Sequence, residues 1–363
     1  MHPYVIQEMT TMMQETFGNP SSIHGFGRIA HEKLETARQL IADSLKVNDH
    51  EIIFNSGGTE GDNTAILETA FSRKKDGNHL ITTAIEHPAV LNTMKYLETQ
   101  GFEVTYLPVD EKGNISLTDF DEALSDETIL VSIMFGNNEI GNLMPIKEIG
   151  ERLREHPAYF HTDAVQAYGN QTIHPRELGV DLLSISAHKI NGPKGVGFLY
   201  KKDGINIPSL LLGGEQEEKR RAGTENLAGI WGMAQAVKLL TAEEREARSE
   251  KYAGFQELIL NTLEKEGISY QVNGDLNNKL PHVLNLRLPG VANDLLLMKL
   301  DLNGIAISTG SACTAGNIEP SHVLEAMYGK DTPILKESIR ISFGYGNTKE
   351  EVQRFLDVLI QSI

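Results

Sequence analysis

A lysine follows an apolar, strand-like run in DLLSISAHKINGPKG, where Lys189 comes directly after His188 and shortly after Ser186. Lysine is seldom placed at the rim of a buried sheet without a partner. An amine removed from water has a lowered pKa and becomes a competent nucleophile for a Schiff base. A single lysine of this kind is more often a solvated surface residue, so other groups must support the assignment.

Two further runs also end in polar groups, at the strand ends where open parallel sheets bind ligands. In EIIFNSGGTEGDN, glycines and Thr59 precede a helix, which suits phosphate binding by backbone N–H groups. In AYFHTDAVQAYG, Asp163 ends the run and Gln166 lies three residues later, so a carboxylate there can pair with a cationic ring nitrogen. Each feature alone could equally be a helix cap. Together with Lys189, they are the groups that a pyridoxal-phosphate site requires.

Three other side chains could take part in chemistry. His87 in AIEHPAV follows a strand-like run, where an imidazole could stack on a flat cofactor and move protons, although most such histidines are structural. Cys313 lies among small residues in STGSACTAGNIEP, which argues against a packed core position. Arg340, inside SIRISF, could be a structural ion-pair partner or a fork for a substrate carboxylate.

Strand-like and helical patterns alternate from about residue 28 to residue 200, which predicts βα units and a mostly parallel sheet. A helix over 28–45 carries apolar residues at the spacing of a sheet-covering helix. The charged stretch within 233–265 predicts one long helix that crosses between domains. We expect a large domain over 15–245 and a small α+β domain over 246–363, joined by 1–14.

The small domain is expected to contain strands at ISYQV, HVLNLRL, IAIST and SIRISF. We also expect a Leu-rich helix that ends at Gly304, a helix from Ser321, and a last helix that begins with the capping box of Thr348 and Glu351. No internal repeat is evident.

The composition excludes several classes of protein. The formal net charge of -17 opposes broad binding to nucleic acid or to anionic membranes. Cys313 is the single cysteine, so an intramolecular disulfide and a multi-cysteine metal site are excluded, and we expect no metal. No apolar run reaches the roughly 18 residues of a membrane span, so we expect a cytoplasmic protein. A dinucleotide-binding protein is disfavoured because no G-x-G-x-x-G follows the first strand.

The chain closely resembles the NifS/IscS-type cysteine desulfurases, within the class V aminotransferase group of fold type I pyridoxal-phosphate enzymes. The resemblance covers nearly the whole chain and rests on FGNPSSIHGFGR, SGGTEGDN, EHPAV, NNEIG, HTDAVQ, SAHKINGPKG, RAGTEN, STGSACTAG and IRISFG. The pair SAHK and GSAC is the most specific part. The resemblance implies an α/β fold whose large domain has a mostly parallel sheet of the seven-stranded type.

The resemblance also implies a role for each candidate residue. The cofactor, pyridoxal 5'-phosphate, would be bound covalently by Lys189. Asp163 would contact its ring nitrogen, Gln166 its ring hydroxyl and His87 its ring face. Its phosphate would be held by Gly58, Thr59, Ser186 and His188, together with Thr224 from the second subunit of a homodimer. Asn138 and Arg340 would hold the substrate carboxylate. Cys313 would form the persulfide, so the catalytic residues would be Cys313, Lys189 and His87.

The implied activity is removal of sulfur from L-cysteine, which gives L-alanine and a persulfide on Cys313. The persulfide would pass to an acceptor protein, an iron–sulfur scaffold or a tRNA-thiolating enzyme. A selenocysteine lyase or a class V aminotransferase is the alternative, because neither needs this thiol. A second alternative is a non-catalytic scaffold subunit.

Two segments depart from the pattern of the family. Members usually begin with a strand and turn of the form YLDxAATTP, and this chain starts at Met1 where that motif should just have ended. We expect restoration of the segment to raise activity if it completes the pocket. The loop LGGEQEEKRRAGT carries Glu215, Glu218 and Lys219 where glycines or an arginine are common. We expect cofactor binding to survive these differences, whereas their effect on loop mobility and on substrate affinity stays open.

Overall fold

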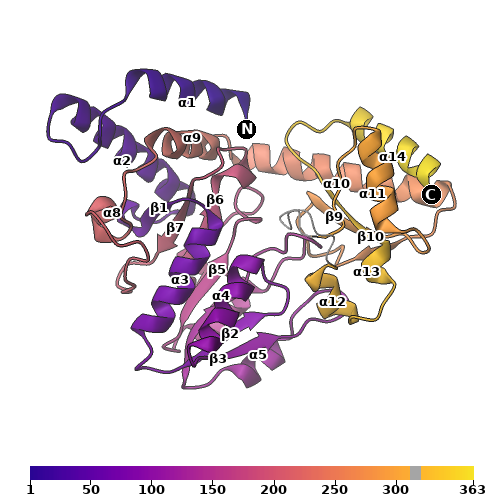
Figure 1. Cartoon of the computed structure of the whole chain (residues 1–363), viewed down its shortest axis with the longest axis horizontal. Helices are drawn as coiled ribbons and strands as arrows, with labels where there is room; N and C mark the ends of the chain where they lie inside the picture. Colours follow the sequence, from indigo (N-terminus) through magenta and orange to yellow (C-terminus); the bar gives the residue numbers. More distant parts are fainter. Residues whose placement is uncertain (311–319) are drawn as a thin grey trace. The chain divides into compact units, whose positions relative to one another are not determined.

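The computed structural model describes residues 1–310 and 320–363 of the chain. It divides into two compact units (Figure 1). Unit 1 comprises 1–106, 117–135 and 145–244, and unit 2 comprises 107–116, 136–144 and 245–363. In the described part of the chain, no helix combines the length and the apolar content that a membrane crossing needs.

Unit 1 is built on a seven-stranded sheet of order β1-β7-β6-β5-β4-β2-β3 within the described residues. The strands are β1 (Ile52–Asn55), β2 (His79–Thr83), β3 (Glu103–Leu107), β4 (Thr128–Ser132), β5 (Tyr159–Asp163), β6 (Leu182–Ser186) and β7 (Gly197–Lys201). Strands β2, β4, β5 and β6 pair in parallel, whereas β7 is antiparallel to both β1 and β6. The α/β fold class and the mostly parallel seven-stranded sheet are therefore confirmed.

Helices connect these strands and cover the sheet. They are α1 (Pro3–Glu15), α2 (Gly25–Leu45), α3 (Gly58–Ser72), α4 (Pro88–Thr99), α5 (Leu117–Ala123), α6 (Ile146–Leu153), α7 (Pro175–Leu178), α8 (Gln216–Lys219) and α9 (Leu227–Lys238), with short 3₁₀ turns η1 (Asp49–Glu51) and η2 (Ala187–Ile190). Helix α2 buries Leu34, Ala37, Ile41 and Leu45, which lie on one helical face. Helices α1 and α2 both pack against α9.

Helix α3 lies unusually close to the sheet because Gly61 has no side chain. A Cβ on Gly61 would lie 2.8 Å from the Ser184 Oγ on β6. Helix α3 contacts β4, β5, β6 and β7. The glycine therefore brings the first turns of α3 against the middle of the sheet, directly after the carboxyl end of β1.

Unit 2 contains a three-stranded antiparallel sheet of order β10-β9-β8 within the described residues. Its elements are α10 (Ala242–Lys265, which starts in unit 1), β8 (Gln271–Asn273), β9 (Val283–Arg287), α11 (Asn293–Leu302), α12 (His322–Tyr328), α13 (Ile334–Glu337), β10 (Ser338–Ser342) and α14 (Lys349–Ser362). Side chains of β9, β10, α10, α11 and α14 form one apolar core. The expected small α+β part is confirmed, including the Ser321 N-cap of α12 and the capping box of Thr348 and Glu351.

The long helix expected for the charged stretch is confirmed as α10, which runs from unit 1 into unit 2. It starts not near residue 233 but at Ala242, where the Thr241 Oγ1 accepts a hydrogen bond from the Glu244 N–H (3.2 Å), and the preceding helix α9 ends at Lys238. One expectation about a strand is wrong. IAIST does not form a strand, since only Ser308 bonds to β10, through Arg340 in both directions. ISYQV contributes only the short strand β8.

Candidate active site

Several expected groups lie at one edge of the unit 1 sheet. Strands β5 and β6 are parallel neighbours, so Asp163 and Ser186 at their ends face the same edge. Gly197 at the start of β7 pairs with Asn55 at the end of β1 and with Ser186 at the end of β6. Strand β1 therefore also ends at this edge, where the chain turns into α3. The topology brings together the Gly-rich turn, the aspartate and the Ser-Ala-His-Lys segment.

Asp163 is a buried carboxyl group at the end of β5, 7% exposed. Its Oδ1 accepts a hydrogen bond from the Val165 N–H (2.9 Å). Burial raises the pKa of Asp163, while the His87 imidazole, the Val165 N–H and the Lys189 ammonium group act to lower that pKa. A second cation, such as a protonated ring nitrogen, would stabilise the ionised form further.

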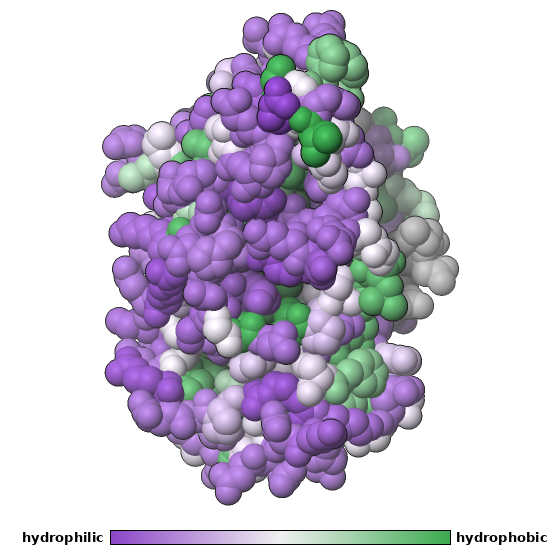
Figure 2. Space-filling view, turned by 90° about the vertical axis from the view of Figure 1, so that its left-hand side faces the viewer, coloured by the Kyte–Doolittle hydropathy of each residue, from purple (hydrophilic) through white to green (hydrophobic). Residues whose placement is uncertain are grey.

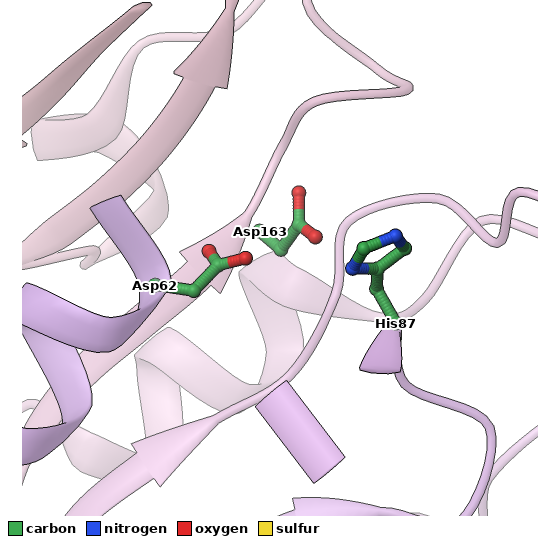
Figure 3. Close-up of side chains that lie close together, drawn as sticks. All are labelled: Asp62, His87 and Asp163. Carbon is green, nitrogen blue, oxygen red and sulfur yellow. The ribbon is translucent and has the colours of Figure 1, made fainter. Parts of the chain in front are cut away.

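His87 lies beside Asp163 and is the N-cap of α4. Its Nδ1 accepts a hydrogen bond from the Ala89 N–H (3.1 Å), so the neutral ring carries its proton at Nε2. Figure 3 shows Asp163 between Asp62 and His87. His87 also lines a cavity of about 430 Å³ with Thr59, Asn63 and Tyr96. The histidine ring and the start of α3 therefore border the same hollow.

The start of α3 and the end of β6 form a candidate phosphate cradle. No side chain caps α3, whose N-cap Gly57 has φ 142°, a conformation that favours glycine. A Cβ on Gly57 would lie 3.4 Å from the Ser186 Oγ, and this hydroxyl is 2.7 Å from the His188 Nδ1. Burial and the neighbouring Lys189 and Lys194 lower the pKa of His188. Backbone N–H groups, a hydroxyl and nearby cations suit a phosphate, so the residues fit pyridoxal phosphate.

The remaining unit 1 candidates are less buried than Asp163. Lys189 lies in η2 and is exposed in the chain alone, in contrast to the burial expected from the sequence. Its charge is close enough to act on the pKa of Asp163. Gln166 is half-buried in the turn after β5. Thr224 is exposed between α8 and α9, and within the described part of the chain its side chain makes no hydrogen bond to the sheet edge.

Arg340 and Asn138 come together in unit 2. Ile339 and Ile341 of β10 face the apolar core, so Arg340 points to the opposite face of the sheet, where it pairs with Asn285 of β9. The segment 136–144 lies over this face, because the Asn285 Nδ2 donates to the Glu139 carbonyl (3.1 Å). The Arg340 Nη1 donates to the Asn138 carbonyl (3.0 Å). Both Arg340 and Asn138 are buried, each 8% exposed.

Cys313 lies outside the described residues, so its predicted position cannot be compared with a structure. Ser321, in the described part of the chain after Cys313, is held in unit 2. The Ser321 Oγ donates to the Glu139 Oε2 (2.5 Å) and also caps α12 by accepting from the Leu324 N–H. Glu139 is fully buried and belongs to the same NNEIG motif as Asn138.

Three buried titratable residues at the unit 1 edge were not predicted: Asp62, Glu86 and His161. His161 could have been inferred, because it lies two residues before Asp163 on β5 and so faces the same side of the sheet. Glu86 directly precedes His87 in the sequence. Asp62 gave no comparable signal, since an acidic residue near the start of a helix is ordinarily an exposed partner of the helix dipole.

The comparisons with known proteins cover nearly the whole chain. The family model described as aminotransferase class-V matches residues 1–355. A Bacillus subtilis (strain 168) protein designated IscS 1 is 54% identical over 353 residues, which is 97% of this chain and 93% of that protein. The cysteine desulfurase IscS of Clostridium botulinum (strain Hall) is 46% identical over 359 residues, covering 98% of this chain and 90% of its own.

Solved structures agree with these relatives. A structure described as a NifS-like protein superposes with a TM-score of 0.92 at 36% identity, covering 99% of this chain and 95% of its own. A structure described as SspA in complex with cysteine superposes with a TM-score of 0.83 at 35% identity, covering 94% and 95%. The chain therefore belongs to the class-V aminotransferase family, and its relatives in that family include proteins named cysteine desulfurase.

Proposed function

We propose that this chain is a pyridoxal-phosphate-dependent cysteine desulfurase, which converts L-cysteine to L-alanine and retains the sulfur as a persulfide. One observation carries the proposal: a buried Asp163, the His87 ring and the Ser186–His188 cradle meet at one sheet edge beside Lys189. The relatives at 46–54% identity, among them proteins named cysteine desulfurase, support the substrate. So does the structural neighbour described with cysteine bound.

Bound pyridoxal phosphate would supply an electron sink for the α-carbon of an amino acid. Asp163 would hold the proton on its ring nitrogen, His87 would lie on its ring face, and Gln166 would bind its ring hydroxyl. Gly58, Thr59, Ser186 and His188 would hold its phosphate. Lys189 would hold it covalently and, once displaced by substrate, would accept the α-proton of the substrate at Nζ.

Arg340 and Asn138 would hold the substrate carboxylate. Arg340 is charged at any physiological pH and can form two parallel hydrogen bonds to a carboxylate. The Asn138 Oδ1 has no hydrogen-bond partner among the described residues, although it is buried. This oxygen is an acceptor and needs a donor, whereas the Nδ2 of the same amide can donate a hydrogen bond to a carboxylate.

The thiolate of Cys313 would accept the sulfur. A sulfur–sulfur bond forms at Cys313, the carbon–sulfur bond of the substrate breaks, and a proton completes alanine. The thiolate is needed because it, rather than the thiol, is the nucleophile. An acceptor protein, either an iron–sulfur scaffold or a tRNA-thiolating enzyme, would then take the outer sulfur. We propose the cytoplasm as the location, since thiols stay reduced there.

We further propose that two copies of the chain form a homodimer, with Thr224 reaching the phosphate of the partner's cofactor. Four strongly exposed apolar side chains of unit 1 support this: Phe17 (75%), Ile23 (93%), Phe26 (59%) and Leu212 (91%). The rings of Phe17 and Phe26 pack together with centroids 5.1 Å apart. Exposed apolar groups of this kind mark interaction surfaces. On the face drawn in Figure 2, hydrophilic residues predominate and hydrophobic ones form smaller patches.

The Cys313→Ser variant tests the proposed function. The visible absorbance of the bound cofactor should be unchanged and should still respond to added cysteine, because Lys189 and Asp163 are intact. Alanine release and protein-bound persulfide should both fall to background, since a serine hydroxyl is a far poorer nucleophile near neutral pH. Alanine release at the wild-type rate would favour the aminotransferase or lyase activity instead.

The homodimer has its own test. Sedimentation should give twice the mass of one chain, and a mixed dimer of Thr224→Ala and Lys189→Ala chains should keep one undamaged site. A monomer that turns over cysteine would contradict the shared site.

A further inference from the structure

A second carboxyl group lies directly behind Asp163. Asp62 of α3 is 1% exposed, and its Oδ1 has no hydrogen-bond partner among the described residues. One oxygen of Asp62, one oxygen of Asp163 and one ring nitrogen of His87 all lie within 4.8 Å of one another. In Figure 3, the Asp62 carboxyl group points toward Asp163 from the side opposite His87. Nothing in the proposed cofactor contacts uses Asp62.

The close approach of α3 to the sheet fixes this position. Gly61 permits the approach, because its absent Cβ would lie 2.8 Å from the Ser184 Oγ. The Asp62 Oδ1 is then 3.5 Å from the Nε2 of the fully buried His161. His161 is held at both ring nitrogens, with its Nδ1 2.8 Å from the Ser132 Oγ and its Nε2 3.0 Å from the Ser184 Oγ.

The surroundings of the two aspartates differ in charge. Burial and the negative charge of Asp163 raise the pKa of Asp62 well above its ordinary value; a hydrogen bond from Ser184 acts to lower it, and Glu86 acts to raise it further. Burial lowers the pKa of His161 to about 3, so the nearest imidazole is neutral and offers Asp62 no cation. The His87 imidazole, the Val165 N–H and the Lys189 ammonium group act instead to lower the pKa of Asp163.

Two buried carboxyl groups this close do not both ionise. The negative charge therefore resides on Asp163 and the proton on Asp62. We propose that Asp62 is a positioning residue: it holds a proton behind Asp163 and so keeps that carboxylate ionised and aimed at the ring nitrogen of the cofactor. The role of Asp163 as the partner of the cofactor ring nitrogen rests on the proposed function, whereas the presence of a proton on Asp62 does not.

Cofactor affinity separates a proton donor from a packing residue. Asp62→Ala removes the proposed donor and should weaken cofactor binding roughly ten-fold or more, which is the loss expected if the Asp62 proton is hydrogen-bonded to the Asp163 carboxylate. Asp62→Asn supplies an N–H donor of the same size and should stay within about two-fold of the wild type. Thr69→Ala, another fully buried polar residue of α3, controls for lost packing and should leave the affinity unchanged. The dissociation constant is read from the visible absorbance during dialysis.

Two results would overturn the proposal: unchanged affinity in Asp62→Ala, or equal weakening in Asp62→Asn and Asp62→Ala. The first would show that Asp62 does not act on Asp163. The second would show that a donor at this position is not what matters.

A measurement on the cofactor-free protein tests the proton itself. An aspartate whose pKa is raised by folding binds a proton in the folded state that the unfolded chain has released, so stability falls as pH rises above about 3.9. Asp62→Asn lacks this loss. Its melting temperature should therefore exceed that of the wild type by an amount that grows as the pH rises above about 4. A difference that is constant or shrinks with pH would show that Asp62 is ionised in the fold.

The two measurements also separate this inference from the proposed function. If the wild-type protein bound no pyridoxal phosphate, the proposed function would fail, and the melting profile would still report whether Asp62 holds a proton.

Discussion

The candidate groups of unit 1 and of unit 2 are positioned in different ways. In unit 1, Asp163 and Ser186 are the last residues of β5 and β6, and Lys189 follows three residues later. In unit 2, Arg340 lies in the middle of β10, and its contact is the carbonyl of Asn138, 202 residues earlier in the sequence. A strand end is visible in a local pattern. The contact of a mid-strand residue depends on which face of the strand is covered and on which distant segment of the chain covers that face.

The candidate groups of the two units also lie in different electrostatic environments. The unit 1 edge gathers buried carboxyl groups whose protonation depends on one another, at Asp62, Glu86 and Asp163. Arg340 instead keeps its charge and is held by a backbone carbonyl. We therefore expect changes in unit 1 to affect the cofactor, and changes in unit 2 to affect the substrate.

The largest effect is expected at Lys189. Lys189→Ala should abolish the covalent link to pyridoxal phosphate, because no other lysine occupies that strand end. The measurement is visible absorbance after dialysis. Lys194→Ala, at an exposed lysine five residues later, should keep the absorbance. A retained band in Lys189→Ala would refute the assignment.

Arg340→Ala should act on substrate rather than cofactor. Loss of a charged hydrogen bond removes about 1.5 to 3 kcal/mol of binding free energy, so KM for cysteine should rise roughly ten- to a hundred-fold. The cofactor absorbance should not change. Arg287→Ala on the neighbouring strand removes an ion pair with Glu337 (2.8 Å) and serves as the matched control, with KM unaltered. An equal rise in both variants would mean that Arg340 is only structural.

The buried ammonium group of Lys279 in unit 2 should lower the free energy of unfolding. Its Nζ is buried and has no hydrogen-bond partner among the described residues, and burial lowers its pKa from 10.5 to about 8. Below pH 8 the folded and the unfolded chain both carry the proton on Lys279, so the folded state bears the full cost of the buried charge. Between about pH 8 and pH 10.5 the folded state releases this proton, so the free energy of unfolding should rise with pH.

Lys279→Met should remove this pH dependence and add about 2 kcal/mol at neutral pH. Chemical unfolding at several pH values measures it. Lys336→Met, at an exposed lysine of the same unit, should show neither change.

The smallest effect is expected in the loop of unit 1 where Lys219 departs from the family pattern. Its φ is 68°, and Glu217 and Glu218 before it also have positive φ. A left-handed residue with a side chain is strained by about 1 kcal/mol relative to glycine. Lys219→Gly should raise stability by about this amount, measured by urea unfolding. Lys219→Ala should bring no gain, which would show that the exposed ion pair with Glu215 (3.0 Å) contributes little.

The sequence alone determined the strand ends of unit 1 and the order in which they occur. Alternation of apolar and helical runs identified each strand of the parallel sheet, and the polar residues that follow them were read directly from the chain. The Ser321 N-cap and the capping box at Thr348 could also be predicted, since a cap depends on residues within one turn. The long helix α10 was also predicted, although its start at Ala242 was placed too early.

Only the tertiary structure decided how buried groups are paired. Asp62, His161 and Ser184 lie 99 and 23 residues apart in the sequence and meet because Gly61 lets α3 approach β6. The same holds for Arg340 and Asn138, which meet through the covered face of a three-stranded sheet. Periodicity tells which face of an element is buried, but the partner on that face comes from distant chain, so the charge of a buried group follows from packing rather than from local pattern.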